Sequence, residues 1–254
     1  MSGPLVIKIG GSTLGDADST FADVAAVANA GDIPIVVHGG GAEATRWLEA
    51  MGIPSRFENG LRVTDDAALP VIVAVYAGLV NKRIVAALNA AGCPAAGVSG
   101  IDGLCVECVQ DETGLGHVGH PAKVHTAVFD ALLGAGIVAV VAPIGFVRDA
   151  AGVRPLNVNA DHVAGAVAAA VGAPEAVYLT DVDGVRGGDG RVIGRLTAVE
   201  AEGLIAEGVA SGGMMPKLRA CIESARRGVP SRILDGRQPG ALLARSERGT
   251  LVVP

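Results

Sequence analysis

A single lysine, Lys8, is separated by one residue, Ile9, from two adjacent glycines near the start of the chain. The surrounding stretch, VIKIGGS at positions 6–12, has the pattern of a buried strand that ends in a tight turn. Adjacent glycines leave their backbone N–H groups unobstructed, so such a turn can approach a ligand closely. A neighbouring ammonium group can neutralise an anion there. The stretch therefore fits a phosphate, although an ordinary turn after a strand explains it equally well.

A second glycine turn, HGGGA at positions 38–42, follows the next predicted strand and opens a predicted helix. Consecutive glycines at a strand-to-helix turn expose several N–H groups beside a helix N-terminus, which is an anion-binding arrangement. Two such turns in one chain favour a phosphate-binding function more strongly than either turn alone. Neither turn matches the P-loop or the dinucleotide pattern.

The elements that must position these turns alternate between strand and helix along the chain. Strands are predicted at 5–9, 34–38, 95–98, 137–142, 176–179, 231–234 and 250–253, and helices at 20–30, 42–51, 67–91, 123–135, 159–171, 198–207 and 215–227. Most predicted strands are continuous apolar runs, which is typical of strands covered on both faces. The alternation predicts an α/β fold with a mostly parallel sheet, whose ligands bind beyond the carboxyl ends of the strands.

Composition and charge restrict the classes of partner that this protein is expected to bind. The 254 residues carry a formal net charge of −6, half of them are apolar, and the charges form no basic block. Nucleic acid and a membrane surface are therefore not expected as partners. The start of the chain lacks a signal-peptide pattern, and the longest uncharged run, 131–147, is interrupted by glycine and proline. We expect a cytoplasmic protein.

Seven stretches in order resemble the amino acid kinase family, and most closely its N-acetylglutamate kinase branch. Besides the two glycine turns these are FENGLRVTD at 57–65, GLVNK at 78–82, SGIDG at 99–103, NVNAD at 157–161 and SGGMMPK at 211–217. The resemblance implies a three-layer αβα sandwich with a central, mainly parallel, eight-stranded sheet. It also implies a single kinase domain, with an N-terminal lobe (1–172) for acyl amino acid binding and dimerisation and a C-terminal lobe (173–254) for the nucleotide.

The implied reaction is transfer of a phosphoryl group from ATP, bound with Mg²⁺, to the side-chain carboxylate of N-acetyl-L-glutamate, a step of arginine biosynthesis. A carboxylate is already ionised at neutral pH and needs no general base. The enzyme must instead position two anions and neutralise the charge on the moving group. By resemblance, Lys8 contacts the β- and γ-phosphates, Lys217 acts on the leaving side, and Asp161 lies between the two ammonium groups.

The resemblance also assigns binding residues. Arg62, Asn157 and Asn159 would hold the acyl amino acid, since a guanidinium can grip a carboxylate at two points. A surface arginine, and helix capping by Asn159, are the structural alternatives. The amides of Gly10, Gly11, Gly40 and Gly41 would donate to the transferring phosphoryl group, and the nucleotide would contact Thr180, Asp181, Gly184, Gly212 and Gly213.

Cysteine and histidine gather between positions 105 and 125. Cys105, Cys108, His117, His120 and His125 could suggest zinc. The offset of Cys105 and Cys108 does not place both on one face of a strand. In the resembling family this region is a hairpin near the substrate pocket without metal, so we expect no metal site.

Two alternatives remain open. The segment VYAGLVNKR at 75–83 is closer to a sister branch that phosphorylates aminoadipate or glutamate attached to an acidic amino-group carrier protein. A basic rim, which such a partner would favour, is not evident in this acidic chain. The second alternative is a non-catalytic amino-acid or nucleotide sensor on the same fold.

Because the chain starts close to its first strand, we expect a homodimer built through 67–91, without strong arginine inhibition.

Overall fold

A central sheet of eight strands organises the computed structural model, which describes residues 3–10, 17–58, 60–150, 152–210 and 214–254. Neighbouring strands run parallel except β13 and β14. The mainly parallel sheet predicted from the sequence is therefore confirmed. Across the sheet the order is β12 (Arg195–Thr197), β14 (Thr250–Val253), β13 (Ser231–Asp235), β11 (Ala176–Thr180), β1 (Val6–Ile9), β2 (Ile35–His38), β8 (Val138–Ala142) and β5 (Ala95–Ser99).

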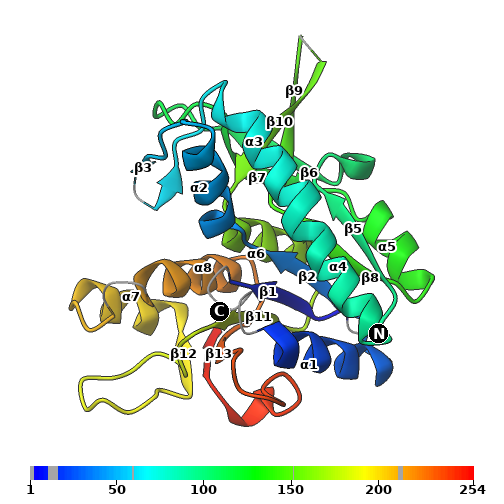
Figure 1. Ribbon diagram of the computed structural model, residues 1–254. Coiled ribbons are helices and arrows are strands. Elements are labelled where there is room, and N and C mark those ends of the chain that lie inside the picture. Colours follow the sequence, from blue (N-terminus) through cyan, green and yellow to red (C-terminus); the bar gives the residue numbers. More distant parts are fainter. Residues whose placement is uncertain (1–2, 11–16, 59, 151, 211–213) are drawn as a thin grey trace.

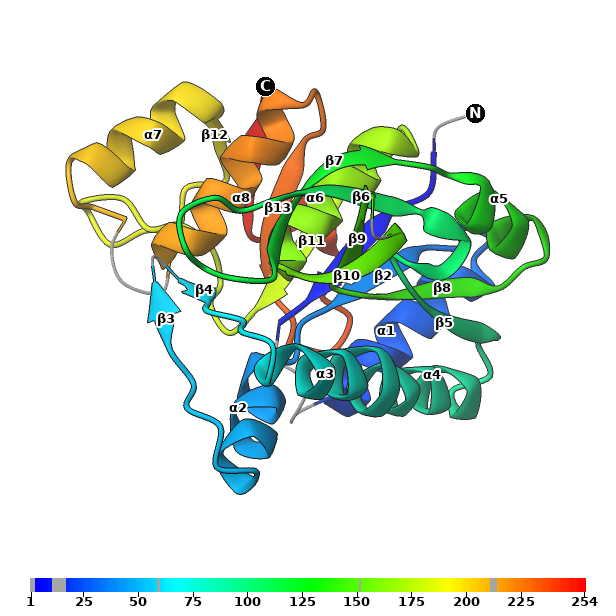
Figure 2. The same cartoon turned by 90° about the horizontal axis from the view of Figure 1, so that it is seen from above.

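Helices cover both faces of this sheet and complete the three layers (Figures 1 and 2). One layer contains α5 (Ala127–Gly134), α6 (Ala160–Ala170), α7 (Ala198–Ala206) and α8 (Met214–Arg226). The other contains α1 (Ala17–Asn29), α2 (Gly41–Ala50), α3 (Ala68–Val73) and α4 (Asn81–Ala90). The predicted helices match these bounds within a few residues, except at α5.

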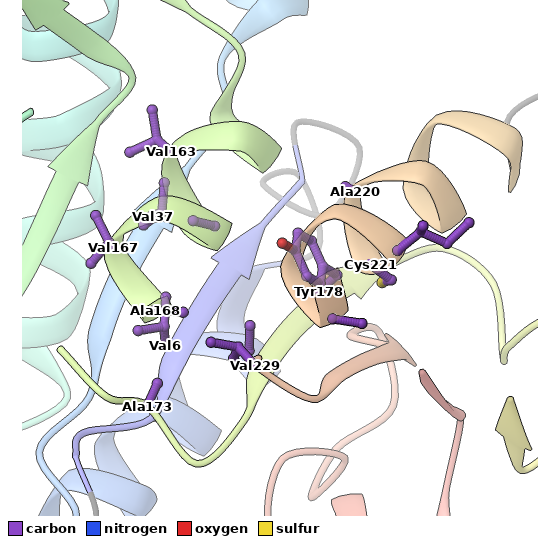
Figure 3. Packing of buried hydrophobic residues seen from close by; sticks show 14 of the residues in the cluster. Val6, Val37, Val163, Val167, Ala168, Ala173, Tyr178, Ala220, Cys221 and Val229 are labelled. Atoms are coloured by element: carbon purple, nitrogen blue, oxygen red, sulfur yellow. The ribbon is translucent and has the colours of Figure 1, made fainter. Parts of the chain in front are cut away.

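Alternation along the strands decides which side chains meet which layer. Val6 and Tyr178 face the layer of α6 and α8, and Figure 3 shows Val6 beside Ala168 of α6 and Tyr178 beside Cys221 of α8. Ile7 lies on the opposite face. Because side chains alternate with period two, Lys8 shares the face of Val6, and the same parity places His38 on the face of Val36, toward α4.

Six short strands outside the sheet were not placed by the strand prediction. A closed four-stranded barrel consists of β6 (Val106–Gln110), β7 (Val118–Val124), β9 (Ile144–Asp149) and β10 (Gly152–Val158). A small hairpin consists of β3 (Phe57–Glu58) and β4 (Leu61–Arg62). In Figure 1 the β9–β10 hairpin projects from the top of the molecule. The predicted helix at 123–135 was wrong at its start, because Lys123 and Val124 pair with β6 as the end of β7.

The long helical segment after the β3–β4 hairpin changes its hydrogen-bonding pattern midway. Between α3 and α4 lies a π-helical stretch, η1 (Ala74–Val80). The whole span, Ala68–Ala90, is the one helix among the described residues that is long and apolar enough to cross a membrane by composition, with an 18-residue window of mean hydropathy 1.7. It lies along the sheet beside α1 and α2 (Figure 2). Its apolar residues thus pack in part against the protein's own core.

Candidate active site

A cavity of about 230 Å³ opens where the predicted substrate residues converge. It lies at the carboxyl ends of β1 and β2, as expected for a parallel sheet. The second glycine turn, the β3–β4 hairpin and the junction of β10 with α6 form its walls. Its lining includes Lys8, Gly40, Gly41, Phe57, Arg62, Tyr76, Val118, Asn157, Asn159 and Asp161.

Lys8 and Asp161 form the charged pair at this cavity. Lys8 projects from β1 toward α6, whose first turn carries Asp161, and their Nζ and Oδ1 atoms lie 2.7 Å apart. Both side chains are largely but not completely buried, at 14% and 17% exposure. An ammonium group held in this way is positioned for an anion before any ligand arrives.

Lys217 pairs with a different carboxylate. It lies in the first turn of α8, and its Nζ is 3.4 Å from Oδ1 of Asp181, which follows the end of β11. Asp161 belongs to α6 and pairs with Lys8, whereas Lys217 comes from α8 and pairs with Asp181. The placement of Asp161 between both ammonium groups stays a prediction.

A buried network of hydrogen bonds supports the second glycine turn. His38 Nδ1 lies 2.7 Å from the Gly39 carbonyl oxygen, and Asn81 Nδ2 donates to His38 Nε2 at 3.2 Å and to the Val140 carbonyl at 2.9 Å. Since Nε2 accepts, the ring proton resides on Nδ1 and is donated to Gly39. Burial lowers the pKa of His38 to about 4. The imidazole is therefore neutral near pH 7 and fixes the orientation of the Gly39 peptide.

Arg62 lies against the glycine turn inside the cavity wall. Its Nη2 donates to the Gly41 carbonyl and to Thr45 Oγ1, each at 2.8 Å, and its Nη1 donates to Ser55. The Phe57 ring covers the guanidinium at 4.4 Å. The side chain is 5% exposed, and its Nε is buried without a hydrogen-bond partner among the described residues. A buried donor of this kind is costly unless a ligand or another acceptor satisfies it. The surface-arginine alternative does not hold.

The two asparagines of the 157–161 motif both line the cavity but have different partners. Asn157 is buried at the end of β10, where its Nδ2 donates to Thr64 Oγ1 at 2.9 Å. Asn159 is the N-cap of α6, and its Oδ1 accepts from the backbone N–H of Asp161 at 2.7 Å and of His162 at 3.3 Å. The capping role considered for Asn159 is thus present, together with its place at the cavity.

A second, larger cavity of about 490 Å³ opens beyond the end of β11. Asp181 and Gly184, two of the predicted nucleotide residues, line it with Val209, Met214, Asp235 and Arg237. Thr180 is not part of the lining; its hydroxyl donates to Asp181 at 3.0 Å, and this bond is the main cause that lowers the pKa of the Asp181 carboxyl. A Cβ at Gly184 would lie 2.6 Å from a Val192 methyl, so packing also requires glycine there.

Three predicted ligand residues, Gly11, Gly212 and Gly213, lie outside the described residues; Gly10 directly follows β1. The sequence analysis missed Tyr76, Thr64, Asp235 and Arg237. Asp235 ends β13, and its carboxylate accepts two hydrogen bonds at 2.9 Å from the Arg237 guanidinium. The rule that polar residues at the carboxyl ends of parallel strands form sites could have identified this pair. Tyr76 carried no such signal.

The cysteines and histidines between 105 and 125 are distributed over the hairpin β6–β7 and its flanks. Cys105 and Cys108 are buried, and burial is the main cause that raises the pKa of each thiol to about 12. His117, His120 and His125 each lie beside a separate carboxylate, that of Asp66, Asp111 and Glu107 respectively. In the part of the chain that the structure describes, no group of three or more potential ligands gathers to hold a metal ion.

Comparison with known proteins places this geometry in a family. Residues 3–235 match the model of the amino acid kinase family. An acetylglutamate kinase from Rubrobacter xylanophilus is 47% identical over 251 residues, covering 98% of this chain and 96% of that protein. One from Dehalococcoides mccartyi is 42% identical over 248 residues, covering 96% and 91%. The crystal structure of N-acetylglutamate synthase from Neisseria gonorrhoeae, complexed with coenzyme A and N-acetyl-glutamate, matches with a TM-score of 0.84 at 26% identity, over 99% of this chain and 59% of that one. The chain belongs to the amino acid kinase family.

Proposed function

We propose that this kinase transfers the γ-phosphoryl group of ATP to the side-chain carboxylate of N-acetyl-L-glutamate, giving N-acetylglutamyl 5-phosphate for arginine biosynthesis. The observation that carries this proposal is a single small cavity that brings Lys8, the second glycine turn and Arg62 together. Relatives named acetylglutamate kinase, similar over nearly the whole chain, support the choice of substrate. Two cationic groups in one cavity suit a substrate with two carboxylates.

The chemical step needs charge neutralisation and alignment. An oxygen of the acceptor carboxylate forms a bond to the γ-phosphorus, the bond from that phosphorus to the bridging oxygen of ATP breaks, and ADP leaves with the electron pair. No proton moves. Lys8, held at 2.7 Å by Asp161, offsets charge on the phosphoryl oxygens, and we assign Lys217 to the ADP side. Backbone amides of the glycine turns donate hydrogen bonds to the phosphoryl group during its transfer.

We assign ATP to the cavity beyond β11, since its apolar and charged lining suits a base, a ribose and phosphates. Mg²⁺ bound with ATP would neutralise phosphate charge and orient the reacting groups. The nearby carboxylates of Asp181 and Asp235 already hold Lys217 and Arg237. This donor set fits an ion carried mainly by the nucleotide phosphates rather than one held in a protein cage.

The lobes and the assembly belong to the same proposal. We assign residues 1–172 to the acyl amino acid and to dimerisation, and residues 173–254 to the nucleotide. An 18-residue window of Ala68–Ala90 is 39% buried inside the chain, and Pro70, Ala74 and Ala86 are exposed, so part of this helix is free to pack against another copy. A homodimer formed along this helix would cover that surface. We further propose a cytoplasmic location for this biosynthetic step.

Trapping the acyl phosphate with hydroxylamine tests the activity directly. Purified protein with ATP and Mg²⁺ should give hydroxamate with N-acetyl-L-glutamate at a far higher kcat/KM than with N-acetyl-L-aspartate. Glutamate and aminoadipate attached to a carrier protein form the third arm of the assay. Product with the carrier-linked substrates alone would replace acetylglutamate as the acceptor, and turnover with none of them would identify a sensor.

A further inference from the structure

Tyr76 is a buried aromatic residue in the wall of the substrate cavity to which the motifs assign no role. It is 7% exposed and lies in the π-helical stretch η1. Such stretches within α-helices are frequent at functional sites, because the extra residue per turn redirects side chains. Tyr76 lines the cavity together with Lys8, Arg62 and Asn157.

The glycine turn brings Tyr76 and Arg62 to neighbouring positions. A Cβ at Gly40 would lie 2.9 Å from the Tyr76 ring, and one at Gly41 would lie 3.9 Å from Arg62 Nη2. The Tyr76 ring therefore packs against the backbone of Gly40, and the Arg62 guanidinium lies beside that of Gly41. Burial raises the pKa of Tyr76, and the nearby Arg62 guanidinium opposes that rise. The phenol remains protonated at neutral pH and can act as a donor.

Arg62 alone does not provide hydrogen-bond donors for both oxygens of a bound carboxylate. Its Nη atoms are engaged by Gly41, Thr45 and Ser55, whereas its buried Nε has no partner among the described residues. A carboxylate that accepts from Nε presents a second oxygen, and that oxygen needs a donor of its own. Tyr76 lines the same cavity and its phenol lies beside the Arg62 side chain, so its hydroxyl can supply this donor.

We propose that Tyr76 is a substrate-binding residue whose hydroxyl donates a hydrogen bond to the carboxylate that is not phosphorylated, next to Arg62 Nε. This inference rests on the proposed function and deepens it. It makes Tyr76 a determinant of specificity for acceptors with an α-carboxylate. Its ring, packed on Gly40, also explains why no larger residue fits at that position of the turn.

The test combines Tyr76→Phe with an acceptor that lacks the α-carboxylate. For N-acetyl-L-glutamate, loss of a hydrogen bond to a charged group should raise KM about tenfold or more, with kcat nearly unchanged. With 4-acetamidobutyrate, which keeps the acetamide and the reacting carboxylate, parent and variant should give the same kcat/KM. Where that analogue turns over too slowly, its inhibition constant against N-acetyl-L-glutamate provides the same comparison.

Tyr178→Phe is the matched control, because it removes the only other phenol of the chain, which bonds to Ser224 at 2.8 Å in the core. Any effect of this control should be the same for both acceptors, and thermal unfolding of each variant reports structural damage. An equal loss with both acceptors in Tyr76→Phe would make the hydroxyl merely structural and overturn the inference. Failure of the parent to use N-acetyl-L-glutamate would instead refute the proposed function.

Discussion

Lys8 comes from the first strand and Asp161 from a helix in the middle of the chain, yet their charged atoms lie 2.7 Å apart. Asp161 has two structural functions: its carboxylate pairs with Lys8, and its backbone N–H donates to the Asn159 cap of α6. The ion pair therefore fixes the ammonium group to the start of a helix that is itself held in place by Asn159. Catalysis by positioned charge depends on such fixation before the substrate binds.

Replacing Lys8 by Met tests this role, since methionine fills a similar space without the charge. We expect kcat for N-acetyl-L-glutamate to fall about a hundredfold, while KM for the acceptor changes little. Steady-state kinetics with hydroxamate trapping provide the measurement. Lys123→Met, at an exposed site on β7, is the matched control and should retain the parent rate. A Lys8→Met enzyme with the parent kcat would contradict the mechanism.

His38 predicts a pH dependence of stability. Its pKa is lowered from 6.5 to about 4 by burial, with Lys82 nearby acting in the same direction. Between these values the unfolded chain binds the proton and the folded chain does not, so stability is lost as pH falls from 6.5 toward 4. The contribution at stake is ~3 kcal/mol. Urea unfolding of the parent and of His38→Gln across this range should show a shallower dependence in the variant.

At the scale of elements, the first turn of α6 is where structure and function share residues. Asn159 caps this helix through its Oδ1, and the same residue lines the substrate cavity. The motif NVNAD could be located from the sequence because strand-to-helix turns with capping residues have a local signature. The partner of Lys217 could not, because it depends on how α8 and the end of β11 are placed by distant packing.

Two substitutions at Asn159 separate capping from substrate binding. Asn159→Ala removes the cap and should lower the free energy of unfolding by ~1 kcal/mol, together with activity. Asn159→Asp keeps an acceptor for the cap and should retain stability, but its negative charge should repel the anionic substrate and raise KM. Urea unfolding and kinetics on both variants decide the matter. Full activity in Asn159→Asp would assign this side chain to capping alone.

At the scale of the whole molecule, seven of the eight sheet strands and the two helical layers were predictable, whereas the short edge strand β12 and the barrel were not. Buried parallel strands are continuous apolar runs, so their positions show directly in the sequence. Barrel strands such as β10 contain Gly152 and Pro155, and although β10 forms a hairpin with β9, it also pairs with β7, which is distant along the chain. This closing pair, including Asn157 with Val118 beside the cavity, follows from tertiary contacts rather than from local pattern.

The exposed side of the helical span Ala68–Ala90 is the expected dimer interface. Pro70, Ala74, Gly78 and Ala86 lie on one stripe of this helix; the first, second and fourth are exposed, and nothing lies within 4 Å of a Cβ added at Gly78. Apart from Lys82, which lies between Gly78 and Ala86, the stripe carries small side chains that permit close approach of a second helix. We expect light scattering to give the mass of two chains for the parent and of one chain for Ala74→Arg combined with Ala86→Arg.

The control for this pair is Ala206→Arg, which places a single arginine at an exposed helical alanine of α7, away from the stripe. This variant should keep the mass of two chains. Arginine at the stripe replaces close contact by a bulky charge that a buried interface cannot accommodate without a partner. A dimer that persists with both stripe arginines would move the interface to another face. A monomeric parent would remove the proposed explanation for the exposed apolar surface of this helix.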